Sequence, residues 1–174
     1  MRSSGAPVSS AAGHPRRRRS SAPAQRHVMF HMPAPEYDHS YGTCTETYST
    51  VRIFSDQIEP NAVTKALGLV PTECFTKGDI HGNGLRRKFH GWFFSTKNLS
   101  GSRDTRYHLD LILAALEGKS KAIQELRARG CELDICSYWA SEGQGGPEIT
   151  PRQMLKLGAM GLSVWWDIYF SGHK

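Results

Sequence analysis

The alternation of two hydrophobic periods along the chain limits its fold more than any other feature of the sequence. From about Tyr48 onward, stretches in which every second residue is apolar, as in half-buried β-strands, are separated by stretches with the spacing of amphipathic helices. This pattern predicts the order β-α-β-β-α-β-α-β. The strands are expected over residues 48–55, 73–77, 91–97, 131–139 and 162–170, and the helices within residues 56–69, 103–130 and 149–161.

Helix boundaries are clearest at the start of the last helix. Thr150 is a good N-cap, Pro151 suits the first helical position, and Gln153 completes a Thr-x-x-Gln capping box. The long helical stretch over residues 103–130 contains Gly118, which we expect to break or bend it.

The fold class follows from the number of helices and from the hairpin signals between the strands. Three helices are too few for a doubly wound sheet, and the Gly-containing residues 81–84 favour a hairpin loop. We therefore expect an α+β fold, a two-layer sandwich with about three helices packed on one face of an antiparallel or mixed sheet. A disordered tail is expected over residues 1–45 and a single α+β domain over residues 46–174.

The last predicted strand, within GLSVWWDIYF, carries one acid among apolar residues. Alternation places Asp167 on an outer face with Trp165 and Tyr169, and predicts a core face that ends in Ile168 and Phe170. If the strands are neighbours, Asp167 belongs to a polar and aromatic set rather than to the core. That set comprises Arg52, Glu132, Asp134, Tyr138, Trp165, Asp167 and Tyr169.

Three interpretations of this outer face stay open. It is an ordinary solvated face on which Arg52 pairs with Asp134 or Asp167, or a recognition surface, or a catalytic site with paired carboxylates, one of which would need a raised pKa. Nucleic-acid binding by the folded domain is disfavoured because the acids would repel phosphates. No catalytic residue is assigned. The candidate ligand- or partner-binding residues are Arg52, Trp92, Asp134, Trp165, Asp167 and Tyr169.

The cysteines and histidines show no metal-binding pattern. No pair among the four cysteines has Cys-x-x-Cys spacing, and His81, His90 and His108 lack the spacing of metal ligands. We expect free thiols in a reducing compartment, with no metal and no cofactor. No run approaches the ~18 apolar residues of a membrane span. These features predict a cytoplasmic protein that does not enter a membrane.

The N-terminal tail holds most of the net charge of +6. Residues 1–40 contain six Lys or Arg and two acids, whereas the rest of the chain contains 16 basic and 14 acidic residues. The tail is rich in Ser, Ala, Pro and Arg, which predicts disorder. It is interpreted as an extension upstream of a start at Met29 or Met32, as an organellar transit peptide, or as a nucleic-acid-binding arm that uses the arginines at 16–19.

Several motifs together resemble a known family. These are VRIFSDQIEPNAVTKALGLVPTECFTKGD, then GWFFST, then CELDICSYW, then ITPRQMLKLGAMGLSVWWDIYF. In this order they resemble the bacterial domain-of-unknown-function family numbered 4279, over about residues 48–170. The resemblance implies a small bacterial cytoplasmic domain and supplies no catalytic residues. The matching residues are Arg52, Ile53, Phe54, Pro60, Thr64, Leu67, Gly68, Pro71, Thr72, Lys77, Gly78, Trp92, Ser95, Leu155, Leu157, Asp167, Ile168 and Tyr169.

Three functions are carried forward from the sequence. The first is a non-enzymatic binding or interaction module that contacts a protein partner, or a second copy of itself, through the exposed sheet face. The second is a small hydrolase-type enzyme that uses Asp134 and Asp167 with Arg52. The third is nucleic-acid association through the basic tail, with residues 1–28 as the arm.

Overall fold

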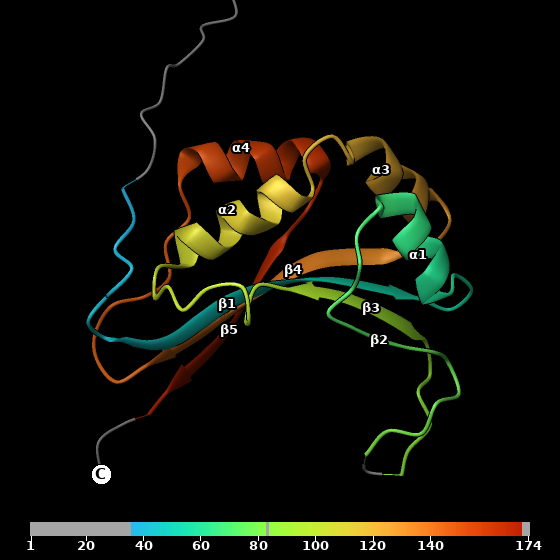
Figure 1. The fold of residues 1–174 in the computed structure, drawn as a ribbon, viewed down its shortest axis with the longest axis horizontal. Coiled ribbons are helices and arrows are strands. Elements are labelled where there is room, and N and C mark those ends of the chain that lie inside the picture. Colours follow the sequence, from blue (N-terminus) through green and yellow to red (C-terminus); the bar gives the residue numbers. More distant parts are fainter. Residues whose placement is uncertain (1–35, 83, 172–174) are drawn as a thin grey trace, which may run out of the picture. The chain divides into compact units, whose positions relative to one another are not determined.

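The computed structural model describes residues 36–82 and 84–171 of the 174-residue chain. In this part, four helices pack on one face of a five-stranded sheet (Figure 1). The strands are β1 (Cys44–Ser55), β2 (Glu73–Phe75), β3 (His90–Ser95), β4 (Glu132–Ser141) and β5 (Val164–Phe170). The helices are α1 (Pro60–Leu67), α2 (Thr105–Ala115), α3 (Ser120–Ala128) and α4 (Pro151–Met160). The predicted α+β architecture is confirmed.

The number of helices corrects the prediction. The stretch expected to form one helix over residues 103–130 forms two, α2 and α3, because the backbone is left-handed at Gly118 (φ 73°). A helix cannot continue through that conformation. The order along the chain is therefore β-α-β-β-α-α-β-α-β. Both helices keep the apolar stripe of the original pattern, and its residues are buried: Leu109, Ile112, Leu113, Leu116, Ile123 and Leu126.

The sheet has the strand order β2-β3-β1-β4-β5. The pairs β2–β3, β3–β1 and β1–β4 are antiparallel, whereas β4 and β5 are parallel. A parallel pair requires a crossover, and α4 supplies it. The central position of β1 brings together residues of β3 and β4 that are distant in the sequence.

The core lies between the helices and the sheet. Val51 and Ile53 of β1, Ile135 of β4 and Trp92 of β3 point toward the helices and are buried. Each alternates with a residue on the other face, as the period of two predicts. Burying an aliphatic side chain of this size stabilises the fold by about 1.5–3 kcal/mol. This burial fixes the register, because a slip of one residue would expose the apolar side chains.

A line of hydrogen-bonded polar side chains crosses this buried face. The hydroxyls of Ser49 and Ser137 are 2.7 Å apart, and Thr96 Oγ1 accepts from the N–H of Ser49 (3.0 Å). Thr96 Oγ1 also lies 2.7 Å from Nδ1 of His108, whose Nε2 lies 2.9 Å from the carbonyl of Ser102. Since a carbonyl only accepts, Nε2 carries the proton and Nδ1 accepts from the Thr96 hydroxyl. Burial lowers the pKa of His108, so the ring is neutral.

The folded part begins before the expected strand. β1 starts at Cys44 rather than Tyr48, so the expected domain boundary after residue 45 falls inside the strand. Residues 1–35 lie outside the described part of the chain, and so do the arginines at 16–19 and the predicted starts at Met29 and Met32.

Candidate functional site

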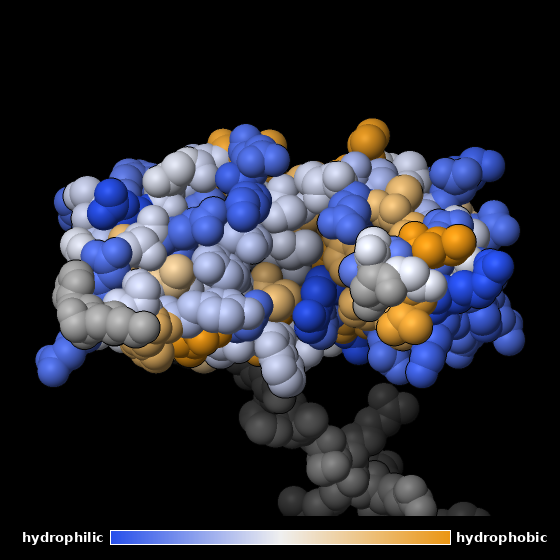
Figure 2. All heavy atoms as spheres, turned by 90° about the horizontal axis from the view of Figure 1, so that it is seen from below, coloured by the Kyte–Doolittle hydropathy of each residue, from blue (hydrophilic) through white to orange (hydrophobic). Residues whose placement is uncertain are grey.

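One face of the sheet is not covered by any of the described helices, which all lie on the opposite side (Figure 1). Figure 2 views the molecule from the uncovered side, where hydrophilic and hydrophobic side chains are intermixed. We call this the open face. The register assigns to it Glu46, Tyr48, Thr50, Arg52 and Phe54 of β1, Gly91, Phe93 and Ser95 of β3, Glu132, Asp134, Cys136 and Tyr138 of β4, and Trp165, Asp167 and Tyr169 of β5.

An ion pair joins the two central strands of this face. Arg52 and Asp134 are directly opposed in the β1–β4 register. Nε of Arg52 donates to Oδ1 of Asp134 (2.8 Å) and Nη2 donates to Oδ2 (2.7 Å). The hydrogen bonds to Asp134 raise the pKa of Arg52 further above its ordinary value. Both carboxylate oxygens of Asp134 are thus engaged by a bidentate guanidinium.

Tyrosines form an aromatic cluster beside this pair. Tyr48 and Tyr138 oppose each other across β1 and β4, and their rings stack at 4.8 Å with an interplanar angle of 12°. Tyr169 of β5 extends the cluster, with its ring centroid 5.3 Å from that of Tyr138. The ammonium of Lys97 lies 4.9 Å from the centre of the Tyr48 ring and 3.3 Å from Glu46. This part of the face therefore presents ring surfaces, hydroxyls and one cation.

Phenylalanines form a second cluster on the other side of the ion pair. The ring of Phe54 lies 5.4 Å from that of Phe93 and 5.3 Å from that of Phe89, in edge-to-face geometry. Phe75 of β2 lies 5.6 Å from Phe93. Phe75 covers Gly91, where an added Cβ would lie only 2.4 Å from the Phe75 ring. Gly91 therefore makes room for the ring over the sheet.

Two hollows flank the centre of the open face. One, of about 280 Å³, is lined by Phe54, Ser55, Asp56, Phe89, Gly130 and Glu132. The other, of about 360 Å³, is lined by Tyr48, Thr50, Thr72, Glu73, Phe93, Ser95, Lys97, Asn98 and Leu99. The first hollow is lined by rings of the phenylalanine cluster, whereas the second is lined by Tyr48 of the tyrosine cluster and Phe93 of the phenylalanine cluster. Both also have polar side chains in their lining.

The predicted binding residues of β5 lie on the same face. Asp167 and Tyr169 touch through a hydrogen bond of 3.4 Å from the phenol to the carboxylate, and the negative charge of Asp167 raises the pKa of Tyr169. Trp165 is 61% exposed. Arg52, Asp134, Trp165, Asp167 and Tyr169 therefore share the face that alternation predicted, while their role in binding stays a prediction.

Trp92 is separated from those five residues. It lies on the helix-covered face, is 1% exposed, and its indole N–H donates to Thr64 Oγ1 of α1 (3.0 Å). Its large apolar ring is a core element, so it is not part of the open face. The open-face residue of the same strand is the adjacent Phe93.

The end of β5 corrects the predicted core. Alternation predicts that Ile168 and Phe170 lie on a buried face, yet they are 44% and 67% exposed. They do point to the side of the sheet that carries the helices, but the helices do not extend over the end of this edge strand. The second half of β5 is thus exposed on both faces.

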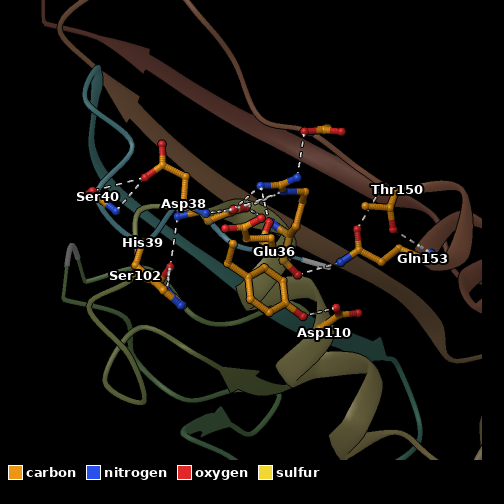
Figure 3. Close-up of polar contacts among 12 residues, drawn as sticks. Glu36, Asp38, His39, Ser40, Ser102, Asp110, Thr150 and Gln153 are labelled. Atoms are coloured by element: carbon orange, nitrogen blue, oxygen red, sulfur yellow. Dashed lines mark hydrogen bonds and ion pairs between the residues drawn. The ribbon is translucent and has the colours of Figure 1, made fainter. Parts of the chain in front are cut away.

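A separate polar cluster ties the segment before β1 to the helix layer (Figure 3). The N–H of Asp38 donates to Asp104, the N-cap residue of α2 (2.8 Å), and His39 Nδ1 lies 2.9 Å from Ser102 Oγ. The phenol of Tyr37 donates to Asp110 (2.6 Å), and burial together with this bond raises the pKa of Tyr37 to about 12.

The same cluster includes the start of α4. The Thr150–Gln153 capping box that the sequence predicts is present. The side-chain amide of Gln153 also donates to the carbonyl of Arg106 in α2 (2.7 Å). Arg106 in turn donates to Asp104 (2.6 Å) and lies 3.4 Å from Glu148. Because these groups satisfy one another, we assign the cluster a structural role.

The sequence pattern identified some of the open-face residues and missed others. Period-two alternation places Tyr48 on the same face as Arg52, but the predicted binding residues do not include it. The proximity of Phe75 and Phe89 depends on how β2 and the loop before β3 fold over the sheet, which alternation does not reveal.

The described residues contain no group of three or more His, Cys, Asp or Glu side chains arranged to hold a metal ion. None of the helices in this part of the chain is long and apolar enough to cross a bilayer. The four cysteines are free thiols.

Comparison with protein families gives one match. The model of the family described as Domain of unknown function (DUF4279) matches residues 45–171, which includes every strand and helix except the first residue of β1. Neither the curated proteins nor the solved structures contain a match to the chain.

Proposed function

Since the chain belongs to the DUF4279 family, whose domain has no assigned function, we propose from its geometry that it is a non-enzymatic binding module that recognises a protein partner through the open face. One observation carries the proposal: two aromatic clusters flank an ion pair on a sheet face that the described residues leave uncovered. A sheet face that contacts only solvent does not require so many aromatic side chains.

The composition of the face supports a protein as the partner. Aromatic residues and Arg are enriched in the well-packed centres of protein interfaces, whereas Lys and Glu lie at their rims. Here Phe93, Tyr138 and Arg52 lie on the three central strands, and Lys97 and Glu46 pair at the side. The two hollows would accept apolar side chains of the partner.

Hydrolase chemistry is less well supported by the same geometry. A general base needs a carboxylate oxygen free to accept a proton, but Arg52 holds both oxygens of Asp134. Neither Asp134 nor Asp167 lines either of the two hollows. Burial raises the pKa of the nearby Cys136, which disfavours the nucleophilic thiolate.

Nucleic-acid association through the basic tail concerns residues outside the described part. On the open face, Glu132, Asp134 and Asp167 oppose phosphate binding, so a nucleic-acid partner for the domain itself is disfavoured.

Photo-crosslinking in cells tests the proposal directly. A photoreactive phenylalanine analogue replaces Phe93 at the centre of the open face, and in a matched control it replaces Leu155, an exposed residue of α4. We expect a discrete crosslinked protein from position 93 that is absent from position 155. Replacing Tyr138 by Ala in the same chain should weaken this crosslink, because a central aromatic residue contributes about 2 kcal/mol or more to an interface. Identical products from both positions, or none from position 93, would contradict the proposal.

A further inference from the structure

Strand β5 forms one edge of the sheet and is much longer than the strand at the other edge. β2 has three residues, whereas β5 has seven and pairs only with β4 in the described part of the chain. A long edge leaves backbone N–H and C=O groups available to another strand. We propose that β5 pairs in antiparallel orientation with β5 of a second copy of this chain, so that two sheets become one.

Two hydrogen bonds show which backbone groups of β5 are already used. The N–H of Ile135 donates to the carbonyl of Ser163, and the N–H of Ser171 donates to the carbonyl of Ser141, both at 3.0 Å. In a parallel ladder, alternate residues direct both backbone groups to the same neighbour. The odd-numbered residues of β5 therefore bond to β4. The backbone N–H and C=O groups that point away from β4 belong to Val164, Trp166, Ile168 and Phe170.

Apart from the charge of Asp167, the edge lacks the features that usually prevent strand pairing. Such edges carry Lys or Pro, or a bulge that interrupts the ladder. The sequence VWWDIYF has neither residue, and its register with β4 is continuous. Its exposed side chains are apolar or aromatic on both faces: Trp165 and Tyr169 on the open face, and Ile168 and Phe170 on the other.

The charge of Asp167 selects the register. Two identical antiparallel strands pair about a two-fold axis, and an axis at Asp167 would place the two carboxylates opposite each other, which is unfavourable. An axis at Ile168 instead places Asp167 opposite Tyr169 of the other copy, whose phenol can donate to the carboxylate. On the other face, Ile168 meets its own copy and Trp166 meets Phe170.

A two-fold axis at Trp166 would also separate the two Asp167 carboxylates, but it pairs the first half of β5 and not the more exposed second half. It would leave the exposed side chain of Phe170 opposite residues before β5. The register centred on Ile168 covers the exposed half of the strand. Its three outward pairs exchange two backbone hydrogen bonds each.

This arrangement has a consequence for the open face. A two-fold axis perpendicular to the sheet keeps both open faces on the same side. The tyrosine clusters of the two copies would then meet at the junction through Tyr169, giving one continuous ten-stranded surface. The edge contact itself does not require the proposed binding function.

The first test is the mass of the full-length protein in solution, measured by light scattering over a dilution series. We expect the wild type to have about twice the mass of one chain. Ile168→Lys places like charges at the two-fold axis and should weaken association at least tenfold. The control, Val70→Lys, changes an apolar residue that is 79% exposed and lies between α1 and β2, at the other end of the sheet, and it should remain dimeric. A monomeric wild type, or a dimer unaffected by Ile168→Lys in a variant with native circular dichroism, would overturn the proposal.

The second test identifies the register through disulfide formation. In a Cys74→Ser background, which removes the exposed native thiol, Ile168→Cys should form a covalent dimer on mild oxidation, because directly opposed Cα atoms lie ~5.5 Å apart. Trp166→Cys should not, since it opposes Phe170. The reverse pattern, or equal crosslinking of both, would refute the register.

The third test uses two variants of Tyr169 and examines the same register without introduced cysteines. Tyr169→Lys should tighten the dimer by pairing with Asp167 of the other copy, and Tyr169→Glu should loosen it. If the strength of the dimer were the same in both variants as in the wild type, the proposed contact would be contradicted. Photo-crosslinking at Phe93 reports on the open face separately, so failure of the edge contact and failure of the binding proposal are distinguishable.

Discussion

Arg52 donates two hydrogen bonds to Asp134, the residue directly opposite it on the neighbouring central strand. The pair lies at the centre of the open face and adds a contact that favours the β1–β4 register already set by apolar burial. The guanidinium carbon of Arg52 also lies 5.9 Å from the centre of the Phe54 ring, so the pair borders the phenylalanine cluster.

The coupling between these two side chains can be measured. Because both are partly exposed, we expect a coupling energy of only about 0.5–1 kcal/mol, toward the upper end because the pair is bidentate. The measurement is a double-mutant cycle of Arg52→Ala and Asp134→Ala by urea unfolding. Coupling indistinguishable from zero would mean that the pair contributes nothing to the register.

Buried His108 makes stability depend on pH. Burial lowers its pKa in the folded state below the value of about 6.5 in the unfolded chain, so the unfolded state binds the proton more readily. The associated stability is fully present above about pH 6.5 and is lost as the pH falls through the folded-state pKa. The slope is at most about 1.4 kcal/mol per pH unit for one proton.

Urea unfolding at several pH values between 5 and 7.5 checks this dependence. The control is His108→Gln, which cannot titrate, although it is expected to be less stable because one buried hydrogen bond is lost. His39 also lies near His108 and lowers its pKa, so only the difference in slope between the wild type and the variant is diagnostic. Equal slopes would show that His108 binds the same number of protons in the folded and the unfolded state over this range, and would contradict the prediction.

The sequence predicts the faces of the strands better than it predicts where the helices end. Alternation correctly assigned the faces of β1, β3, β4 and β5, because the sheet has one covered and one open face. It did not show where the helix layer ends, so Ile168 was expected in the core and is exposed. Gly118 was recognised as a break or bend, but only its left-handed backbone established two helices.

The candidate site was predictable only in part, for a similar reason. Membership of a face is a local property, so Arg52, Asp134, Asp167, Trp165 and Tyr169 could be grouped from the sequence. The rest of the site depends on segments outside the central strands. The phenylalanine cluster forms only when β2 and the segment before β3 fold onto the sheet. Trp92 is predicted as a binding residue but lies in the core, because the sequence alone does not distinguish a buried Trp on a strand from an exposed one.

Gln153 should be more important for stability than its N-cap partner. Replacing Thr150 by Ala removes one cap and should cost about 1 kcal/mol. Gln153 is fully buried, and its side chain both accepts from the N–H of Thr150 and donates to the carbonyl of Arg106. We expect Gln153→Ala to cost about 2–3 kcal/mol in the free energy of unfolding, since a fully buried side chain is lost and two part-buried backbone groups lose their partners. Equal effects of the two variants would show that the bond to Arg106 adds little.

The packing of Phe75 over Gly91 gives the most specific prediction for the open face. In Gly91→Ala the new Cβ would lie 2.4 Å from Cζ of Phe75, so the ring must move off the sheet. We expect a loss of about 1–3 kcal/mol in the free energy of unfolding, the usual cost of overpacking. Phe75→Ala removes the obstacle, so the double variant should be no less stable than Phe75→Ala alone. Gly101→Ala serves as the matched control, because no described atom lies within 4 Å of its added Cβ. Additive losses in the double variant would show that the cost at Gly91 arises from the strand backbone and not from the ring.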